Sequence, residues 1–393
     1  MPPRKSIQSI AAGYKSPSIA IFGSHSALET GLAAKTAGFK TILIAEKGRD
    51  ALYTLHNRHL FDEVILLKQF KEGLREEVQQ KLRDADALLL PNRSMVAYWG
   101  LDAIENRLKV PLYGSRSLLR AEERTAKRSQ YWFLERAKVR TPKRFSSPSR
   151  IDRPVMVKVQ QKRNPRERAF FVATSPDDFR AEAQRRVKQG LISREGLRKA
   201  VIEEYVVGPL LNANFHAYAL KDLFGDLDLV GFSDREQANE SGFRALPAPV
   251  QAGLEARGFP RVNEEVAHRG KTLRESKHEM VYGAAERLLR VFAKEAPPGL
   301  IGPLGLQGAL GLDRRGGVEF VVFDLSLRVP GDPAIGPTSP ALHGVGSLSI
   351  KHRKILGGLR RPFGERRISA PLDLAMMELE VAHREGRLAE VVT

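Results

Sequence analysis

The sequence predicts a mixed protein: an α/β N-terminal part on a doubly wound parallel sheet, followed by an α+β remainder. With 393 residues, the chain exceeds one ordinary hydrophobic core, so two or three packed units are expected. Its 42% apolar content is enough to build them. The first 120 residues alternate strand and helix patterns, whereas later strand patterns follow one another in pairs.

The N-terminal strands are predicted from short β-rich or continuously apolar runs, which are typical of a buried parallel sheet. They are Ser18–Phe22, Thr41–Ala45, Glu63–Leu67, Ala87–Pro91 and Val110–Tyr113. Helical patterns lie between them, for example at Ala27–Ala37 and Lys71–Arg83. In such a sheet, ligands bind at the carboxyl ends of the strands.

The first strand ends in the turn Gly23-Ser24-His25-Ser26. Gly23 permits a sharp bend, and Ser24 or Ser26 is a suitable N-cap for the following helix. The first amides of that helix can bind an anion, and His25 adds a donor or acceptor at the same edge. A capped turn whose histidine only faces solvent explains the pattern equally well.

The remaining elements follow in order. A long helix is predicted over Ser115–Lys138, then a Ser/Pro-rich linker, a strand ending near Lys158 and a second strand after a basic connection. Further helices are expected at about 176–190, at Leu273–Ala293 with Thr272 as a possible N-cap, and at Pro371–Glu385. Further strands are VIEEYVVG, NANFHAYAL, DLDLVGFS, GLQGALGLD and VEFVVFDLSLRV, and residues 237–271 form a polar region that contains Gly and Pro.

Composition excludes several classes of protein. The chain has no cysteine, no apolar leader and no apolar run near the roughly 18 residues of a membrane span, so a soluble cytoplasmic protein is expected. Its net charge of +18 is compatible with nucleic-acid binding. Because the charges are scattered and no nucleic-acid motif is present, a basic surface that handles phosphorylated small molecules is favoured.

Few catalytic motifs are present: there is no GxSxG, HExxH, Walker loop or GxGxxG. Lys158 ends a strand, and the run Glu203-Glu204-Tyr205-Val206 has the form of a nucleotide hinge. Gln307 and Asp324 offer oxygens to Mg²⁺. Each signal is weak alone, but their order resembles that of ATP-grasp enzymes, which activate a carboxylate as an acyl phosphate for attack by an amine.

Longer motifs carry a more specific resemblance. They are GSHSAL (23–28), AEKGR (45–49), PNRSMVAYWGLDAIEN (91–106), EERTAKRSQYWFLERA (122–137), IEEYVVG (202–208), TLRES (272–276) and FVVFDLSLRVPG (320–331). Through them the chain resembles the archaeal formate-dependent 5-formaminoimidazole-4-carboxamide ribonucleotide synthetases, the PurP family. The resemblance implies a pre-ATP-grasp domain at 1–120, a small ATP-grasp lobe at 121–208 and a C-terminal lobe at 209–393.

The resemblance also assigns roles. It implies ATP and Mg²⁺ as cofactors, formate and aminoimidazole carboxamide ribonucleotide as substrates, and a homo-oligomer in some members. The ribonucleotide would be held by Gly23, Ser24, His25, Ser26, Ser94 and His268, and Arg274 and Glu275 would be catalytic. ATP would be held by Lys158, Arg163, Arg166, Glu203, Glu204, Tyr205 and Val206, and the metal by Gln307 and Asp324.

The chain departs from the family pattern on the ATP side. The loop after Lys158, KRNPRER, has no glycine, so Arg163 and Arg166 are expected to replace backbone amides as phosphate donors. Gln307 and Asp324 stand where the family has two glutamates. The residues Gly331-Asp332-Pro333 replace the family's Gly-Thr-Asn, and His268 stands where an asparagine is expected. Glu319, five residues before Asp324, is expected on the opposite strand face, so weak Mg²⁺ binding is predicted.

Two alternatives stay open. The first is a paralogue of the same fold with another acceptor or without ligase activity. The second is a basic nucleic-acid-binding protein with a nucleotide-binding fold, for which binding would fall steeply with salt and ignore ATP.

Overall fold

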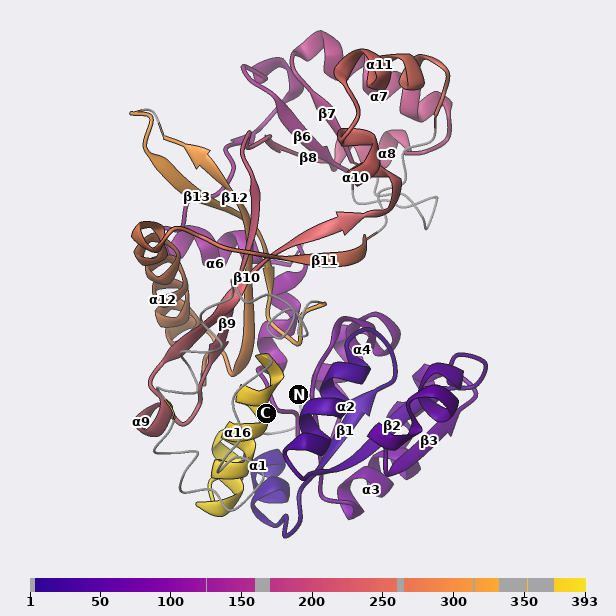
Figure 1. Cartoon of the computed structure of the whole chain (residues 1–393), viewed down its shortest axis with the longest axis vertical. Coiled ribbons are helices and arrows are strands. Elements are labelled where there is room, and N and C mark those ends of the chain that lie inside the picture. The colour runs from indigo at the N-terminus through magenta and orange to yellow at the C-terminus, as the bar shows by residue number, and fades with distance from the viewer. Residues whose placement is uncertain are drawn as a thin grey trace.

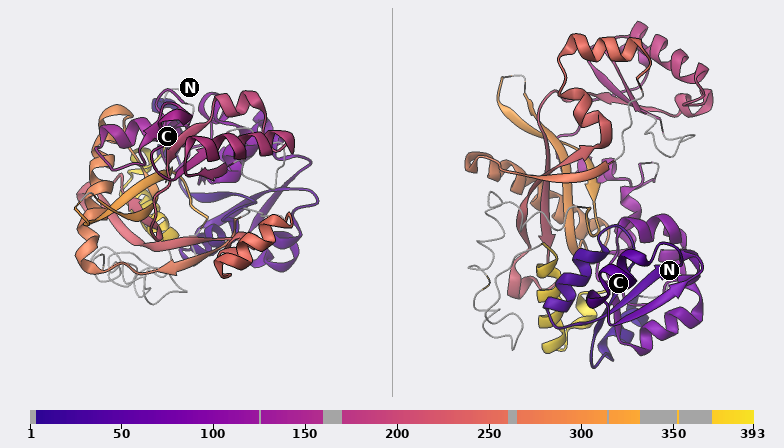
Figure 2. Two further views of the ribbon diagram at one scale, coloured as in Figure 1. Left: turned by 90° about the horizontal axis from the view of Figure 1, so that it is seen from above. Right: turned by 45° about the vertical axis from the view of Figure 1, so that its right-hand side comes forward.

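The computed structural model describes residues 4–124, 126–159, 170–259, 265–313, 315–331, 352 and 371–393 (Figure 1). It contains three sheets, of four, five and four strands. The five-stranded sheet lies in the middle of the molecule, with the N-terminal sheet at one end and the other four-stranded sheet at the opposite end (Figure 2). No helix in these ranges is both long and apolar enough to cross a membrane.

The N-terminal sheet is parallel in the order β3-β2-β1-β4, as predicted. Its strands are β1 (Ser18–Phe22), β2 (Lys40–Glu46), β3 (Glu63–Leu67) and β4 (Ala87–Leu89). Helix α1 (Arg4–Ala12) and helix α2 (Ala27–Thr36) cover one face, and α3 (Glu76–Asp84), α4 (Arg93–Trp99) and α5 (Leu101–Asn106) cover the other. The predicted fifth strand is reduced to a single parallel bridge between Leu89 and Leu112.

Two predicted helices are broken. The Lys71–Arg83 pattern forms a 3-10 turn, η3 (Phe70–Leu74), and then α3, because Arg75 between them is extended. The Ser115–Lys138 pattern forms η4 (Arg116–Glu122) and α6 (Gln130–Arg136). The chain leaves the helix after Glu122, whose carboxylate accepts the N–H of Leu327 at 2.7 Å. This tertiary contact overrides local helix propensity.

The smaller sheet has the order β5-β8-β6-β7 and is antiparallel. Its strands are β5 (Arg144–Phe145), β6 (Val155–Lys158), β7 (Phe170–Ala173) and β8 (Val201–Glu204). Helix α7 (Pro176–Lys188), near its predicted place, and α8 (Arg194–Arg198) follow β7. Ser175 caps α7 by accepting the N–H of Asp178 at 3.1 Å, which fixes where the helix starts.

The central sheet has the order β11-β10-β9-β12-β13 and is antiparallel. Its strands are β9 (Leu210–Ala217), β10 (Leu227–Gln237), β11 (Glu265–Lys271), β12 (Gly302–Leu312) and β13 (Val318–Ser326). The polar region at 237–271, to which the sequence assigned no element, contains β11 and also α10 (Ala238–Arg244) and α11 (Ala248–Ala256). Helix α12 (His278–Glu295) packs on the sheet. It starts after the 3-10 turn η6 (Glu275–Lys277), so the Thr272 N-cap prediction is wrong.

A β-bulge in β13 corrects the expectation for Glu319. Gln307 pairs with Asp324 but the next residue, Gly308, pairs with Val322, so Phe323 is an extra residue. The bulge reverses the alternation of faces, and residues an odd number apart across it share a face. Glu319 therefore lies on the Asp324 side, but its carboxylate is bound by Arg140 Nε at 3.2 Å.

The final helix, α16 (Pro371–Arg384), joins the two ends of the chain. It packs in one core with α1, α2 and the short helix α9 (Lys221–Phe224), as the yellow ribbon in Figure 1 shows. Fully buried Glu378 on α16 accepts the hydroxyl of Tyr113 at 2.7 Å and the N–H groups of Ala219 and Leu220 at 2.7 and 2.9 Å. We call this set the Glu378 clamp. The domain boundaries at 120 and 208 stay a prediction.

The Glu378 clamp predicts a stability difference. Glu378→Gln should lower the free energy of unfolding by about 1–3 kcal/mol, because its amide leaves a buried donor facing other donors. Urea unfolding measures this, with Glu385→Gln, an exposed position directly after α16, as the matched control, expected within about 0.5 kcal/mol of the parent. Equal effects of the two substitutions would contradict a role for the clamp.

Candidate active site

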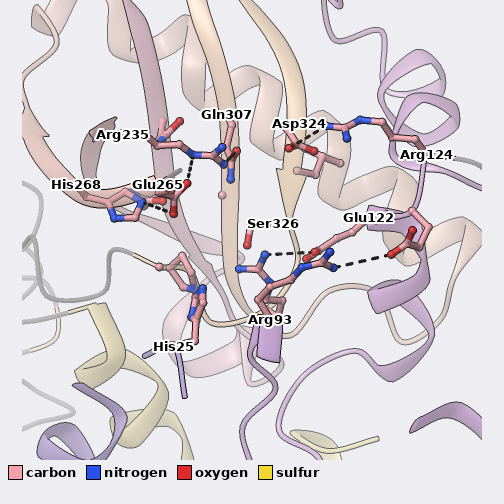
Figure 3. A pocket seen from close by; sticks show the side chains of 18 of the residues that line it. His25, Arg93, Glu122, Arg124, Arg235, Glu265, His268, Gln307, Asp324 and Ser326 are labelled. Atoms are coloured by element: carbon pink, nitrogen blue, oxygen red, sulfur yellow. Dashed lines mark hydrogen bonds and ion pairs between the residues drawn. The ribbon is translucent and has the colours of Figure 1, made fainter. Parts of the chain in front are cut away.

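A cavity of about 520 Å³ lies where the three sheets approach one another (Figure 3). His25 comes from the N-terminal sheet, Lys158 from β6, and Gln307 and Asp324 from β12 and β13. Residues from four separate stretches of the sequence, all singled out as candidates, therefore face one space. His268 on β11 completes this set.

The N-terminal edge is built by the turn after β1. Gly23 is required there, since an added Cβ would lie 2.8 Å from the carbonyl oxygen of Ile44. His25 follows with a φ of 58°, in the left-handed region that a non-glycine residue seldom adopts. Ser26 stands at the N-cap position of α2, but its hydroxyl makes no capping bond and donates instead to the carbonyl of Pro330 at 2.5 Å. The expected capping is therefore absent at Ser26.

A second turn supports the first. Asn92 caps α4 and donates from its side chain to the carbonyl of Ser24 at 3.1 Å. Ser94 Oγ donates to Ser24 Oγ at 3.0 Å, so these two candidates lie on neighbouring turns as expected. Of the predicted ribonucleotide residues, His25 and His268 line the cavity, whereas Gly23, Ser24, Ser26 and Ser94 form the support behind it.

The tautomer of His25 follows from these bonds. Ser26 uses its proton on Pro330, so the 2.7 Å contact between Ser26 Oγ and His25 Nδ1 requires a proton on Nδ1. Nε2 is then the unprotonated nitrogen. It lies 3.5 Å from the place of a Cβ on Gly331, next to His268. Desolvation, reinforced by Arg328, lowers the pKa of His25 to about 4, so Nε2 is an acceptor at neutral pH.

Lys158 lies in a buried polar cluster on the opposite side. Its ammonium is paired with Glu203 on β8, whose other oxygen accepts the hydroxyl of Tyr131 at 3.2 Å. Burial lowers the pKa of Lys158, and the carboxylate of Glu203 opposes that shift. Since both side chains are held in place, Lys158 can present its charge without first ordering a flexible chain.

The hinge after β8 is already partly hydrogen-bonded. The N–H of Glu204 donates to the carbonyl of Lys143, and that of Tyr205 to Pro154, both at 2.8 Å. The Glu204 side chain is bound by Arg140 at 2.9 Å. Within the described ranges the N–H of Val206 has no backbone partner. None of residues 203–206 lines the cavity, and their role toward adenine stays a prediction.

The two residues predicted to hold a metal are bound to arginines. Asp324 is paired with Arg124 at 3.2 Å, and the amide oxygen of Gln307 accepts a hydrogen bond from Arg235. Desolvation tends to raise the pKa of Asp324, but Arg124 and other nearby donors outweigh it and the pKa is lowered. No cluster of three or more His, Asp or Glu that could hold a metal ion occurs in the described ranges.

These contacts do not fit a protein-held Mg²⁺ at Gln307 and Asp324. The ion prefers anionic oxygens and needs several of them free. Here one of the two groups is a neutral amide, and both are used by guanidinium groups (Figure 3). The geometry therefore agrees with the weak Mg²⁺ binding that the sequence predicts at these two residues.

Other candidates lie apart from the cavity. Arg274 and Glu275 are exposed and are not among the residues that line it. Arg163 and Arg166 lie outside the described residues, as do 332 and 333 of the GDP sequence. Their assigned roles stay predictions.

Several cavity residues were not predicted. They are Arg93, Glu122, Glu123, Arg124, Asn212, Asn214, Arg235, Glu265, Ser326 and Arg328. One signal was available in the sequence: Asp324, Ser326 and Arg328 alternate along a strand otherwise rich in apolar residues, which places polar groups on one face. Arg124 was hidden by its position inside an apparently continuous helix.

Comparisons with known proteins agree with this architecture. Residues 19–145 match a family described as a protein of unknown function, DUF1246, and residues 178–393 match a domain of unknown function, DUF1297. A 5-formaminoimidazole-4-carboxamide-1-(beta)-D-ribofuranosyl 5'-monophosphate synthetase of Methanopyrus kandleri is 38% identical over 80% of this chain and 83% of its own. The synthetase of the same name from Methanothermobacter thermautotrophicus is 31% identical over 99% of both chains.

Solved structures show the same fold. An IMP biosynthesis protein PurP from Thermococcus kodakaraensis matches with a TM-score of 0.63 and 22% identity, covering 95% of this chain and all of that one. An ADP complex of N5-carboxyaminoimidazole ribonucleotide synthetase, purK, matches with a TM-score of 0.55 and 11% identity, covering 95% of this chain and 96% of that one.

The sheets and the solved neighbours show an ATP-grasp fold with a preceding parallel-sheet domain, which confirms the predicted fold class. Within that class, the chain belongs to the family of archaeal 5-formaminoimidazole-4-carboxamide ribonucleotide synthetases, the PurP family.

The lowered pKa of His25 predicts its charge state. Its imidazole resonances should titrate with a midpoint near pH 4, so the ring is neutral throughout the physiological range. NMR titration measures this, with the signal assigned by its loss in His25→Gln. A midpoint near the ordinary value of about 6.5 would show that the ring is not desolvated.

The arginine contacts predict weak metal binding. Gln307→Glu combined with Asp324→Glu should tighten Mg²⁺ binding to the ADP-bound protein roughly tenfold, because it supplies anionic oxygens with longer reach. Calorimetric titration with Mg²⁺ measures the affinity. Gln189→Glu with Asp177→Glu makes the same chemical change on exposed α7 positions and should change nothing. Equal affinities of all three proteins would contradict the charge argument.

Proposed function

We propose that this protein is an ATP- and formate-dependent ligase that formylates the 5-amino group of 5-aminoimidazole-4-carboxamide ribonucleotide, a step of purine nucleotide synthesis. One observation carries the proposal: His25 of the parallel-sheet domain and Lys158 and Asp324 of the ATP-grasp lobes line one cavity. A ligase of this kind must hold an acceptor amine next to an acyl phosphate. The names of the relatives from Methanopyrus kandleri and Methanothermobacter thermautotrophicus support the substrate class.

The reaction has two steps. A formate oxygen attacks the γ-phosphorus of ATP, and ADP leaves, giving formyl phosphate. The amine then attacks the formyl carbon, phosphate leaves with the oxygen it received from formate, and the amine loses a proton. Binding in one orientation and stabilising the negative charge account for most of what the protein contributes.

His25 is suited to the acceptor amine. Its Nε2 is an unprotonated acceptor that faces the cavity, and the amine is a donor. Its low pKa lets it accept an N–H hydrogen bond at neutral pH, whereas an imidazolium would repel the donor. The bond between Ser26 and Pro330 positions the ring by fixing its tautomer.

Cations line the cavity from different elements: Arg93, Arg124, Arg328 and Lys158. Each is paired with a carboxylate of the protein, so an anionic reactant would share these cations with those carboxylates. Lys158 is held by Glu203 at the β6–β8 side, where ATP phosphates are expected. The purK neighbour is a complex with ADP, and a carboxylase domain of Hydrogenobacter thermophilus, TM-score 0.55, is described with MgADP. ATP with Mg²⁺ is thus the expected nucleotide form, while Gln307 and Asp324 do not fit a metal ion here.

One observation favours a second candidate within the family. The arginine-bound metal positions depart from what an ordinary member is expected to need. They support a paralogue of the same fold with another acceptor or with slow chemistry. A homo-oligomer and a cytoplasmic location stay predictions.

The proposal predicts that ADP is released only when ATP, formate and the ribonucleotide are present together. A coupled ADP assay measures this, with each substrate omitted in turn. Release with formate but with another amine in place of the ribonucleotide would favour the paralogue. Release that ignores formate would contradict the proposal.

The role of His25 predicts a selective loss. His25→Ala should lower kcat/KM for the ribonucleotide about 100-fold, because an acceptor for the amine is removed. The KM for ATP should change less than twofold, roughly, since the ring lies away from Lys158. His56→Ala, on the solvent-exposed face near β2, is the matched control. An equal fall in kcat/KM for ATP and for the ribonucleotide would assign His25 a structural role instead.

A further inference from the structure

A second cavity, of about 420 Å³, lies between the end of α6 and the second half of α12. Its eight lining residues include five cations and one carboxylate: Arg136, Lys138, Arg287, Arg290 and Lys294, with Glu295. We call it the basic basin. It is a shallow hollow that opens widely to solvent.

The basin carries positive charge that the protein does not neutralise. Glu295 is bound by Arg136 at 3.4 Å and approached by Arg128 at 3.9 Å, so its charge is already shared. Among the described residues, Lys138, Arg290 and Lys294 form no ion pair within 4.0 Å. Glu286 stands one turn before Arg290 on α12 but is not paired with it.

Helix dipoles explain only part of this arrangement. Cations near the ends of α6 and α12 are favoured by the exposed carbonyls there, which accounts for Arg136 and Lys294. Arg287 and Arg290 lie further inside α12. Arg287 stands three residues before Arg290, and Arg290 four residues before Lys294, so like charges share one helix face. This spacing destabilises a helix. An anionic ligand bound between these side chains would attract all of them and so offset their mutual repulsion.

Two backbone features shape the basin. Lys138 has a φ of 50°, a conformation that favours glycine, and it follows Ala137, the C-cap of α6. The guanidinium of Arg287 donates from Nε to the carbonyl of Ala137 at 3.1 Å, which ties α12 to the same turn. The helix end itself explains this positive φ, because the N–H groups of Val139 and Lys138 donate to the carbonyls of Leu134 and Glu135, both at 3.0 Å. These two features shape the basin but do not by themselves indicate a ligand.

The basic basin is separate from the catalytic cavity. Gln130, at the start of α6, bonds to Leu325 of the catalytic cavity at 2.6 Å, whereas Arg136 at the other end of the helix lines the basin. Seven helical residues place these ends about 10 Å apart. No residue lines both cavities, so the basin is a hollow of its own.

We propose that the basic basin is a second, non-catalytic binding site for a small polyphosphate, such as a linear triphosphate or the phosphate end of a nucleotide. Several cations around a concave space of this size match a compact ligand with several charges. A single phosphate would engage too few of them, and a nucleic acid would need a groove that continues beyond the basin.

Titration with inorganic tripolyphosphate tests the site, using the full chain with saturating ADP so that the catalytic nucleotide site is filled. One saturable site is expected. Arg290→Ser with Lys294→Ser should weaken its affinity at least tenfold. Lys188→Ser with Arg194→Ser removes two exposed cations from the small lobe and is the matched control for net charge. ADP affinity should be unchanged in both variants.

The other outcomes overturn the proposal. Titration without saturation, or equal weakening in the two variants, would show that only net charge attracts the anion. Displacement of tripolyphosphate by a single-stranded oligonucleotide at equal phosphate concentration, with tighter binding, would assign the basin to nucleic acid instead. Because binding is read without turnover, this test is independent of whether the ligase reaction occurs.

Discussion

The placement of the active site depends on one buried carboxylate. Glu378, on the last helix, accepts hydrogen bonds from Tyr113 at the edge of the parallel sheet and from the backbone after β9. Tyr113 in turn contacts His216 of β9 at 2.9 Å. A buried carboxylate is stable only when its oxygens are paired, so these groups have to stay together. The parallel sheet is thereby fixed next to the central sheet, with the carboxyl ends of its strands facing β13.

A short cross-connection then brings the reacting groups together. The strand that leaves β13 forms a parallel bridge between Val329 and Asn92, and Pro330 accepts the hydroxyl of Ser26. The same bond that joins the two parts therefore sets the tautomer of His25. This one interaction therefore supports the junction and sets the tautomer of His25. Desolvation of the ring lowers its pKa, which keeps the ring neutral.

Most of the elements could be predicted because their signals are local. Continuous apolar runs predicted β1 to β4, and apolar runs also gave the order of the later strands. A turn after a strand singled out His25, and polar side chains on strands singled out Lys158, Gln307 and Asp324. The helix break near Glu123 could not be predicted, since it depends on Glu122 binding the backbone of Leu327, about 200 residues away. Arg235 was missed for the same reason. Glu265 meets it only after β10 pairs with β11, and Gln307 only after β9 joins β10 to β12. The face of Glu319 was mispredicted because a β-bulge has no clear sequence signal.

The central claim is that this cavity passes an acyl group from a phosphate to an amine. The most direct measurement follows the oxygen of formate. With ¹⁸O-labelled formate, ATP and the ribonucleotide, the released inorganic phosphate should carry one labelled oxygen, because phosphate leaves with the formate oxygen that attacked ATP. Mass spectrometry of the phosphate reads this directly. Unlabelled phosphate, released at the same rate as the formylated product, would contradict the account.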